Sequence, residues 1–357
     1  MMKELRLMKG NEAVAEGAIR AGTDGYFGYP ITPQSEVMEY LMAEQPEKRT
    51  GMVVLQAESE VASINMVYGA ASTGKRVMTS SSSPGISLMQ EGISYCAGAE
   101  LPCLVVNVVR GGPGLGTIQP SQADYFQSVK GGGHGDYRLI VLAPASVQEM
   151  FDFVFLGYDL AFKYRNPILI LSDGLIGQMM EKVELCEQRP RNTVFDPSWT
   201  LTGKTPDRER NIITSLDLDA SQQEKHNQHL QEKYRKAEAE EVRYEELQTE
   251  DADYLFVAYG SSARICQKAI QLGREKGIKI GLLRPITLWP FPKKPLAAIA
   301  PRLKGILSVE QSAGQMIEDV KLSVGCGIRV EHYGRMGGMI PSPEEVLENF
   351  EKLFIKK

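Results

Sequence analysis

The chain has 357 residues, of which 43% are hydrophobic, and this length exceeds what one hydrophobic core usually supports, so two domains are expected. A formal net charge of -5 leaves no basic face for nucleic acid and no general attraction to an anionic membrane. The five scattered cysteines include no C-x-x-C pair, which excludes an iron–sulfur cluster or a disulfide framework built by this chain.

The opening stretch MMKELRLMKGNEAVAEG lacks the uninterrupted apolar run of a secretory signal. No window approaches the ~20 consecutive apolar residues needed to cross a bilayer. We therefore expect a cytoplasmic protein whose partners are small molecules and other proteins.

From residue 10 to about 180, helical patterns alternate with short apolar runs, which is typical of a parallel sheet with crossover helices. The runs are rich in β-branched residues and bounded by Gly, Pro, Asp or Ser, as in strands buried on both faces. The expected strands cover residues 52–56, 75–81, 102–110, 139–144 and 167–173.

A rigid strand-to-helix turn precedes the first of these strands, in the segment GYFGYPITPQSE at 25–36. Pro30 and Pro33 each fix their own φ angle and bias the preceding residue towards extended geometry. The backbone is therefore expected to be held on both sides of Thr32, while Glu36 serves the start of the next helix.

Two carboxylates open the helix expected after strand 52–56. A helix N-terminus favours negative charge, so each of them has a purely structural interpretation. Glu60 lies on the same side as the apolar residues Ile64 and Val67, whereas Glu58 falls in the preceding turn. A carboxylate on the buried side is costly unless something bonds to it, which makes Glu60 a candidate functional residue.

Arg110 ends the apolar strand 102–110 and enters the loop GGPGLG. Ligands bind at the carboxyl ends of parallel strands, and a guanidinium fork matches a carboxylate or phosphate. The alternative is an arginine that only snorkels at the sheet edge. Neither GGPGLG nor KGGGHGD has the spacing of a phosphate-binding fingerprint, so both are interpreted as loops for close backbone approach, with His134 as a candidate site residue.

The serine run TSSSSPG at 79–85 lies between a strand and a helix, where hydroxyls commonly cap backbone amides. No G-x-S-x-G elbow surrounds it, so a nucleophilic serine is not expected.

The composition changes between about 196 and 250, where residues 220–251 contain almost no large aliphatic residues and carry Glu and Lys at spacings that support each other. This pattern predicts a solvated helix plus a linker. His226 and His229 have a spacing that could hold a metal, but no third ligand is evident, so a surface helix is the favoured interpretation.

A second α/β pattern follows the linker and predicts a compact domain from 252 to 357. A Gly-Ser-Ser turn leads into an amphipathic helix at 262–275. The expected strands are 254–259, 278–283, 305–312 and 328–334.

In their order along the chain, these motifs resemble the α subunit of the 2-oxoacid:ferredoxin oxidoreductases, which are thiamine diphosphate enzymes. The matching segments include KGNEAVAEGAIRAG, YPITPQSE, QAESEVASI, TSSSSPG, PCLVVNVVRGGPG, GGGHGDYRLIVLAPASVQE, YRNPILILSDG and LRPITLWPFP. The resemblance implies an α/β thiamine diphosphate-binding fold, with a pyrimidine-type domain whose parallel sheet is flanked by helices. A smaller transketolase C-terminal-like α/β domain would follow, giving the divisions 1–195, 196–251 for the polar helix and linker, and 252–357.

The resemblance also implies roles for residues of the candidate site. Glu60 matches the family glutamate that bonds the pyrimidine nitrogen N1′, and Pro30 and Ile31 are expected beside the same cofactor. Arg110 matches the arginine that binds the substrate carboxylate, and Thr32 matches a threonine near that substrate. Protonation at N1′ favours the imino tautomer that removes the thiazolium C2 proton.

One expected motif is missing. Thiamine enzymes hold the diphosphate and its Mg²⁺ with G-D-G followed about 25–30 residues later by Asn, because the metal requires oxygen ligands. Here SDG at 172–174 lacks the first glycine, and Asn192 follows too soon. The resemblance therefore implies a β subunit that carries the diphosphate and Mg²⁺, and γ or δ subunits that carry iron–sulfur clusters, with CoA and ferredoxin as further reactants.

Within the family, the segments around Arg110 and His134 most resemble the branched-chain enzymes, which act on 2-oxoisovalerate (3-methyl-2-oxobutanoate). A 2-oxoglutarate enzyme is the alternative; it would need a second cationic group, for which Lys130, His134 and Arg138 are candidates. Two further alternatives are another thiamine enzyme, transketolase-like or acetolactate-synthase-like, and a non-catalytic scaffold subunit.

Overall fold

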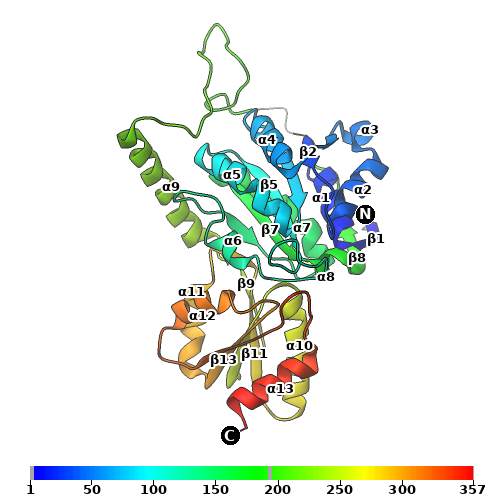
Figure 1. Ribbon diagram of the computed structural model, residues 1–357, viewed down its shortest axis with the longest axis vertical. Helices are drawn as coiled ribbons and strands as arrows, with labels where there is room; N and C mark the ends of the chain where they lie inside the picture. The colour runs from blue at the N-terminus through cyan, green and yellow to red at the C-terminus, as the bar shows by residue number, and fades with distance from the viewer. Residues whose placement is uncertain (1–3, 192–194, 357) are drawn as a thin grey trace.

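Two large sheets organise the chain, one in the upper and one in the lower part of Figure 1. The computed structural model describes residues 4–191 and 195–356, so Asn192 lies outside the described residues. None of the described helices is both long and apolar enough to cross a membrane.

The upper sheet has seven strands in the order β12-β6-β7-β5-β4-β2-β3. All neighbours are parallel except β12, which pairs antiparallel with β6. The bounds are β2 (Gly25–Gly28), β3 (Val53–Gln56), β4 (Val77–Ser81), β5 (Cys103–Val109), β6 (Ile140–Leu142), β7 (Pro167–Asp173) and β12 (Thr287–Trp289). The five strands expected from the apolar runs are confirmed.

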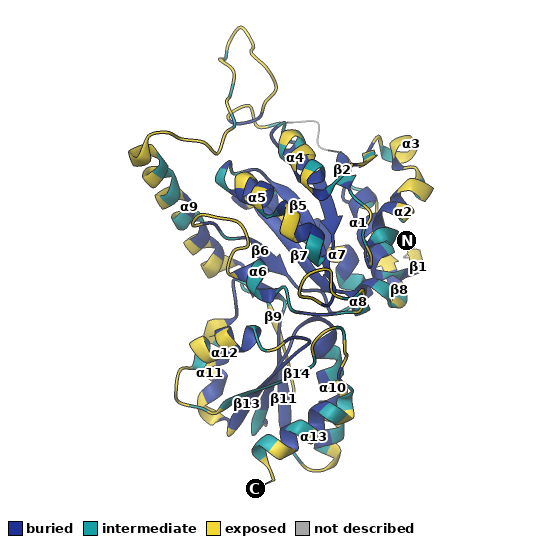
Figure 2. Cartoon of the chain, viewed as in Figure 1, coloured by how far each residue is buried: buried dark blue, intermediate teal, exposed yellow. Residues whose placement is uncertain are grey.

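Helices cover both faces of this sheet because its central strands are apolar on both sides. Val105 of β5 packs in one core with residues of α4 (Glu60–Ala71) and α5 (Ser83–Gly98). Leu104 and Val106 pack in a second core with α1 (Gly10–Arg20) and α7 (Val147–Tyr164). Figure 2 shows β5 and β7 as buried. The fold class predicted from the alternating pattern is confirmed.

The remaining upper elements lie around this sandwich. A two-stranded antiparallel sheet joins β1 to β8. The bounds are β1 (Glu4–Lys9), β8 (Met180–Leu185), α2 (Ser35–Glu44), α3 (Pro46–Thr50), α6 (Tyr125–Val129), α8 (Gly174–Gln178) and α9 (Ala220–Glu240).

The lower sheet has five strands in the order β14-β13-β10-β11-β9. Figure 1 shows α10 and α13 on one side of it and α11 and α12 on the other. The bounds are β9 (Tyr244–Leu247), β10 (Tyr254–Val257), β11 (Ile280–Pro285), β13 (Gly305–Glu310), β14 (Val330–Gly334), α10 (Gly260–Glu275), α11 (Lys293–Ile299), α12 (Met316–Val324) and α13 (Pro343–Phe354). The four strands expected after residue 252 are present, and the division into 1–195, 196–251 and 252–357 stays a prediction.

The helix predicted in the polar segment is α9, and it is less solvated than its composition suggests. Leu230, Tyr234 and Ala237 form its buried side. Lys233 bonds to Glu100 at 3.0 Å, which ties α9 to the loop that follows α5. The helix therefore packs against the upper part rather than lying free in solvent.

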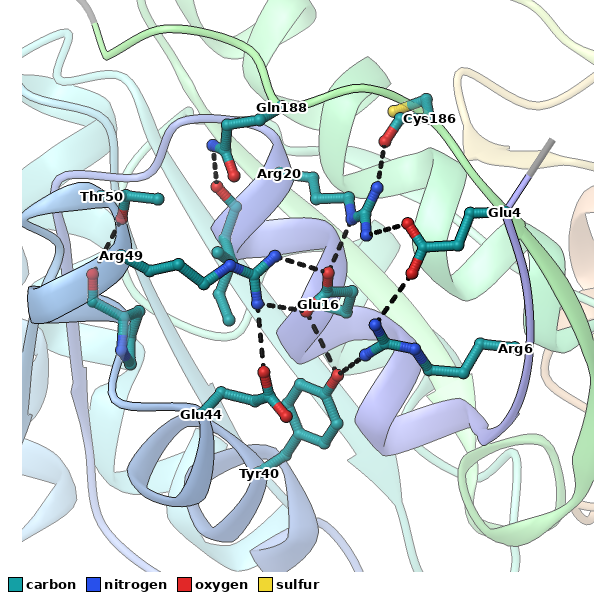
Figure 3. A network of polar contacts seen from close by, with 12 residues as sticks. Glu4, Arg6, Glu16, Arg20, Tyr40, Glu44, Arg49, Thr50, Cys186 and Gln188 are labelled. Atoms are coloured by element: carbon teal, nitrogen blue, oxygen red, sulfur yellow. Dashed lines mark hydrogen bonds and ion pairs between the residues drawn. The ribbon is translucent and has the colours of Figure 1, made fainter. Parts of the chain in front are cut away.

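A buried carboxylate joins the elements around the first helix (Figure 3). Glu16 of α1 is fully buried and accepts from Arg20 Nε at 2.6 Å and from Arg49 Nη2 at 2.9 Å. Tyr40 of α2 donates to its other oxygen at 3.2 Å, and Arg6 of β1 donates to Tyr40 at 2.8 Å. This network fixes α2 against α1, and α2 follows directly on the turn 29–34.

Candidate functional site

The candidate residues converge at one edge of the upper sheet. The turn 29–34 follows β2, α4 follows β3, α5 follows β4, and Arg110 follows β5. These four strands are parallel neighbours, so their carboxyl ends lie at the same edge, where open α/β sheets bind ligands.

Glu60 begins α4 with a buried carboxylate. Its exposure is 5%, whereas Glu58 is exposed, so the distinction predicted from the apolar pattern is confirmed. Ser59 caps the helix by accepting from Ala62 N at 3.2 Å. No hydrogen bond or ion pair to the Glu60 carboxylate occurs within residues 4–191 and 195–356. A carboxylate that is buried and unpaired is suited to a ligand with a hydrogen-bonding nitrogen.

The space in front of Glu60 is kept open by Gly85 of α5. A Cβ atom added at Gly85 would lie 2.5 Å from Glu60 Oε1, closer than real Cβ contacts. An unpaired acid beside such an open position fits the ring nitrogen of an aminopyrimidine, so the residues present fit the thiamine group that the resemblance implies.

A buried chain of hydrogen bonds anchors the turn 29–34. Burial raises the pKa of Tyr26 to about 12, so its hydroxyl keeps the proton and donates to Ser80 Oγ at 2.8 Å. Ser80 donates to Gln34 Oε1 at 2.6 Å, and Gln34 Nε2 donates to Tyr29 O at 3.2 Å. Gln34 was not predicted from the sequence, because nothing in its neighbourhood marks it as buried.

The other side of the turn is held at Pro33. Its carbonyl accepts from Asn11 Nδ2 at 2.7 Å and from Gln178 Nε2 at 2.9 Å. Thr32 is exposed at the tip between these anchors, and the Thr32–Pro33 peptide is cis. The predicted rigid mount around Thr32 therefore has a basis in side-chain contacts as well as in the prolines.

Pro30 and Ile31 complete this tip. Pro30 is exposed and Ile31 is half-buried. Their expected contact with a cofactor stays a prediction.

Arg110 is 9% exposed and reaches across to the turn. Its Nη1 donates to Thr32 O and its Nη2 to Leu115 O, both at 3.0 Å, while Nε is buried without a partner. No carboxylate pairs with it in the described part of the chain. The guanidinium is thus buried rather than snorkelling, and its charge is available to an anionic ligand.

A second carboxylate, Asp124, is linked to the backbone of Arg110 through Asn107 and Ser83. Asp124 accepts from Asn107 Nδ2 at 2.9 Å, and Asn107 Oδ1 accepts from Ser83 N at 3.1 Å. Burial raises the pKa of Asp124, although hydrogen bonds from Asn107 and Ser83 oppose the shift. Ser83 Oγ also accepts from Arg110 N at 3.0 Å, so this cluster fixes the backbone of the arginine.

We expected serines of the run 79–85 to cap the next helix, and this expectation is wrong for Ser82, the N-cap residue of α5. Ser82 makes no cap bond and donates instead to Val108 O at 2.7 Å. A hydroxyl at the end of a central parallel strand has few partners other than the backbone of the neighbouring strand. The local sequence pattern could not predict that Ser82 bonds to the Val108 carbonyl instead of capping the helix.

Two of the candidate cations for a second substrate carboxylate lie elsewhere. Lys130 Nζ bonds to Asp319 Oδ1 at 2.7 Å, in α12 of the lower part. Arg138 precedes β6, and its carbonyl accepts from Asn166, which precedes β7. It therefore lies at the amino ends of the strands, whereas Arg110 lies at the carboxyl end of β5.

The histidines are also dispersed. His134 packs edge-on against Tyr95, near the far end of α5. His226 Nε2 contacts Gly98 O at 2.7 Å, and His229 Nε2 contacts Glu100 Oε1 at 3.1 Å. No group of three metal-ligating side chains occurs among the residues with described positions, in line with the surface-helix interpretation.

The SDG segment joins the two parts of the molecule. Asp173 Oδ2 accepts from Ser261 N at 2.9 Å and from Ser261 Oγ at 2.8 Å, while Oδ1 caps α8 through Ile176 N at 3.1 Å. Burial raises the pKa of Asp173 despite these bonds. The carboxylate is fully engaged within the chain.

The chain matches two family models that together cover most of its length. Residues 16–249 match "Pyruvate flavodoxin/ferredoxin oxidoreductase, thiamine diP-bdg", and residues 252–346 match "Pyruvate:ferredoxin oxidoreductase core domain II".

Individual relatives agree with these models. The chain is 51% identical to ketoisovalerate oxidoreductase subunit VorB of Methanothermobacter marburgensis, over 98% of this chain and 97% of the relative. It is 36% identical to 2-oxoglutarate synthase subunit KorA of Methanothermobacter thermautotrophicus, over 99% and 100%.

A solved structure of a longer chain contains the same fold. The 2-oxoglutarate:ferredoxin oxidoreductase of Magnetococcus marinus, with 2-oxoglutarate, coenzyme A and succinyl-CoA bound, aligns with a TM-score of 0.87 and 28% identity. The alignment covers 98% of this chain and 65% of the longer one. The chain therefore belongs to the pyruvate flavodoxin/ferredoxin oxidoreductase family of 2-oxoacid:ferredoxin oxidoreductases, and it is an oxidoreductase subunit with a thiamine diphosphate-binding domain.

Proposed function

We propose that this chain holds the aminopyrimidine half of thiamine diphosphate and the carboxylate of a branched-chain 2-oxoacid at the edge formed by β2, β3, β4 and β5. The observation that carries the proposal is the pair of buried charges, Glu60 and Arg110, neither of which has a charged partner in the described residues. A scaffold subunit has no need of either, since unpaired buried charge lowers stability.

Glu60 shares a proton with the ring nitrogen N1′ and so controls which tautomer the ring adopts. Thiamine diphosphate bound beside Glu60 would supply the carbon nucleophile and the electron sink for decarboxylation. Pro30 and Ile31 contact the same ring and help to exclude water from it.

Arg110 and Thr32 orient the substrate. The guanidinium binds the 2-oxoacid carboxylate, while its bonds to the Thr32 and Leu115 carbonyls keep it from moving. The Thr32 hydroxyl at the tip of the turn provides a second contact. A carboxylate that leaves as CO₂ gains from being oriented without being overstabilised.

We propose 2-oxoisovalerate as the substrate, with CoA as the acyl acceptor and ferredoxin as the electron acceptor. The VorB relative has higher identity than the KorA relative. Lys130 is paired with Asp319, and Arg138 lies at the amino ends of the strands, whereas Arg110 lies at a carboxyl end. A 2-oxoglutarate-specific pocket would need a cation that these residues do not supply.

Further subunits are part of the same proposal. The engagement of Asp173 within the chain favours a β subunit that binds the diphosphate and Mg²⁺, and γ or δ subunits that carry the iron–sulfur clusters. Exposed apolar side chains lie on α4, on α5 and in the loop after β5, and they suit a partner surface: Val61, Met66, Leu88, Leu115 and Ile118. The domain limits 1–195, 196–251 and 252–357 and a cytoplasmic location complete the proposal.

A substrate panel on the complex of this chain with its co-expressed partner subunits tests the proposal. We expect viologen reduction with 2-oxoisovalerate to exceed that with 2-oxoglutarate or pyruvate by at least about tenfold in kcat/KM. Glu60→Gln, which keeps size but cannot share the proton, should remove most activity and leave the complex assembled. Near-normal turnover of that variant contradicts the role of Glu60, and a preference for 2-oxoglutarate contradicts the substrate.

A further inference from the structure

Ser81 carries a buried hydroxyl that has no role in the proposed binding of the cofactor or the substrate. It ends β4, has no exposed surface, and its Oγ has no hydrogen-bond partner in the described residues. The neighbouring serines are both engaged, Ser80 with Tyr26 and Gln34, and Ser82 with the Val108 carbonyl. A buried polar group without a partner is costly and calls for a specific explanation.

The Ser81 hydroxyl and the Glu60 carboxylate face the same small space. A Cβ atom added at Gly85 would come within 2.5 Å of both Ser81 Oγ and Glu60 Oε1. Because both oxygens lie that close to one point, they are at most about 5 Å apart. Two unpartnered polar groups, one a donor and one an acceptor, thus lie side by side where Gly85 has no side chain to separate them.

We infer that Ser81 is a positioning residue of the thiamine site, whose hydroxyl donates to one oxygen of Glu60 while the other oxygen engages the pyrimidine nitrogen. This inference rests on the proposed role of Glu60. Neither oxygen has a competing partner in the described residues, so each side chain is free to turn towards the other.

The hydroxyl has a defined chemical effect. A donor to a carboxylate stabilises its charged form, so Ser81 favours the state in which the proton resides on the ring rather than on Glu60. Without the hydroxyl, Glu60 keeps its proton more tightly and the ring is less often in its reactive tautomer. The step that slows is removal of the thiazolium C2 proton, before any substrate reacts.

Ser81→Ala in the complete complex, loaded with thiamine diphosphate, tests this inference. We would measure hydrogen–deuterium exchange at the thiazolium C2 by acid quench and NMR across pH, together with the dissociation constant of the cofactor. We expect the exchange rate at C2 to fall by about tenfold, and the acid side of its pH profile to move to higher pH. The dissociation constant of the cofactor should change by less than about threefold. Ser81→Cys, whose thiol is a weaker donor, should lie between alanine and wild type.

Thr79→Val is the matched control. Thr79 lies two residues earlier on the same face of β4, is equally buried, and its hydroxyl also lacks a partner in the described residues. Valine has the same shape, so exchange should stay at the wild-type rate.

Wild-type exchange and pH profile in Ser81→Ala overturn the inference. Glu60→Gln is measured in parallel, because normal exchange in that variant overturns the proposed function as well. If exchange is slow in Glu60→Gln but normal in Ser81→Ala, the proposed role of Ser81 is contradicted and the proposed role of Glu60 is retained.

Discussion

At the scale of single residues, Gly85 decides whether the candidate site can exist. Alanine in a helix is normally more stable than glycine by about 0.5–1 kcal/mol. At Gly85 the added methyl group would meet Glu60 Oε1 and Ser81 Oγ. At this position the gain in helix stability from alanine is therefore opposed by a steric clash with the Glu60 carboxylate.

We expect Gly85→Ala to reduce thiamine diphosphate affinity of the complex by at least about tenfold, because Glu60 is displaced from its position. Isothermal titration calorimetry measures the affinity and thermal unfolding measures the stability. Gly69→Ala in α4 is the control, since a Cβ at Gly69 has no atom within 4 Å. If Gly85→Ala binds the cofactor as tightly as Gly69→Ala, the open position has no functional role.

The sequence predicted part of this site at residue level. The apolar residues Ile64 and Val67 were sufficient to place Glu60 inside and Glu58 outside, because a helix has a fixed angular period. Ser81 was not predicted, since which serine of a run faces α5 depends on how β4 packs under that helix. Arg110 was predicted at a strand end, but its bond to the Thr32 carbonyl depends on a contact across 78 positions.

At the scale of elements, Glu16 links β1, α1, α2 and the segment containing Arg49 (Figure 3). Burial alone would raise the pKa of Glu16, but hydrogen bonds from Arg49 and Arg20 outweigh it, so the pKa lies below its ordinary value. A carboxyl whose pKa is lowered by folding stabilises the protein above the unfolded pKa, and this contribution is lost as the pH falls.

We expect Glu16→Gln to lower the free energy of unfolding at pH 7 by about 3 kcal/mol, because two arginines lose the buried negative charge that pairs with them. Urea unfolding at several pH values provides the measurement. The wild type should lose this advantage as the pH falls below about 4.5, so the two curves converge in acid. Glu39→Gln, an exposed change on α2, is the control; a pH-independent difference would exclude the ionic origin of the effect.

The strands divide into those the sequence predicts and those it does not. Buried parallel strands such as β5 and β7 are continuous apolar runs with clear limits. β1 and β9 are largely exposed and carry charged residues, so their patterns do not differ from those of loops. β12 has three residues and pairs with a strand from a distant segment, which no local pattern can indicate.

At the scale of the whole molecule, Asp173 couples the upper and lower parts. It is the last residue of the interior strand β7 and accepts two hydrogen bonds from Ser261 at the start of α10. Gln122 extends the contact by donating to the Tyr259 carbonyl at 2.9 Å and accepting from Ser262 Oγ at 2.8 Å. All five side chains are buried.

We expect Asp173→Ala to weaken this coupling, because it leaves the Ser261 donors and Ile176 N buried without an acceptor. Differential scanning calorimetry should show the transition broadened or split into two, with the first midpoint lowered by several degrees. Asp159→Ala, on the exposed surface of α7, is the control. A single transition at the wild-type temperature would show that the two parts are coupled elsewhere.

The pairing of β12 with β6 also has a consequence for the synthesis of the protein. The ribosome produces β6 at residues 140–142 long before β12 at 287–289, so the edge of the upper sheet is complete only late in translation. An unpaired strand edge is a template for wrong association. The nascent chain therefore passes through an interval, between the synthesis of β6 and that of β12, in which β6 is an unpaired edge strand. Premature termination within this interval would release an aggregation-prone fragment.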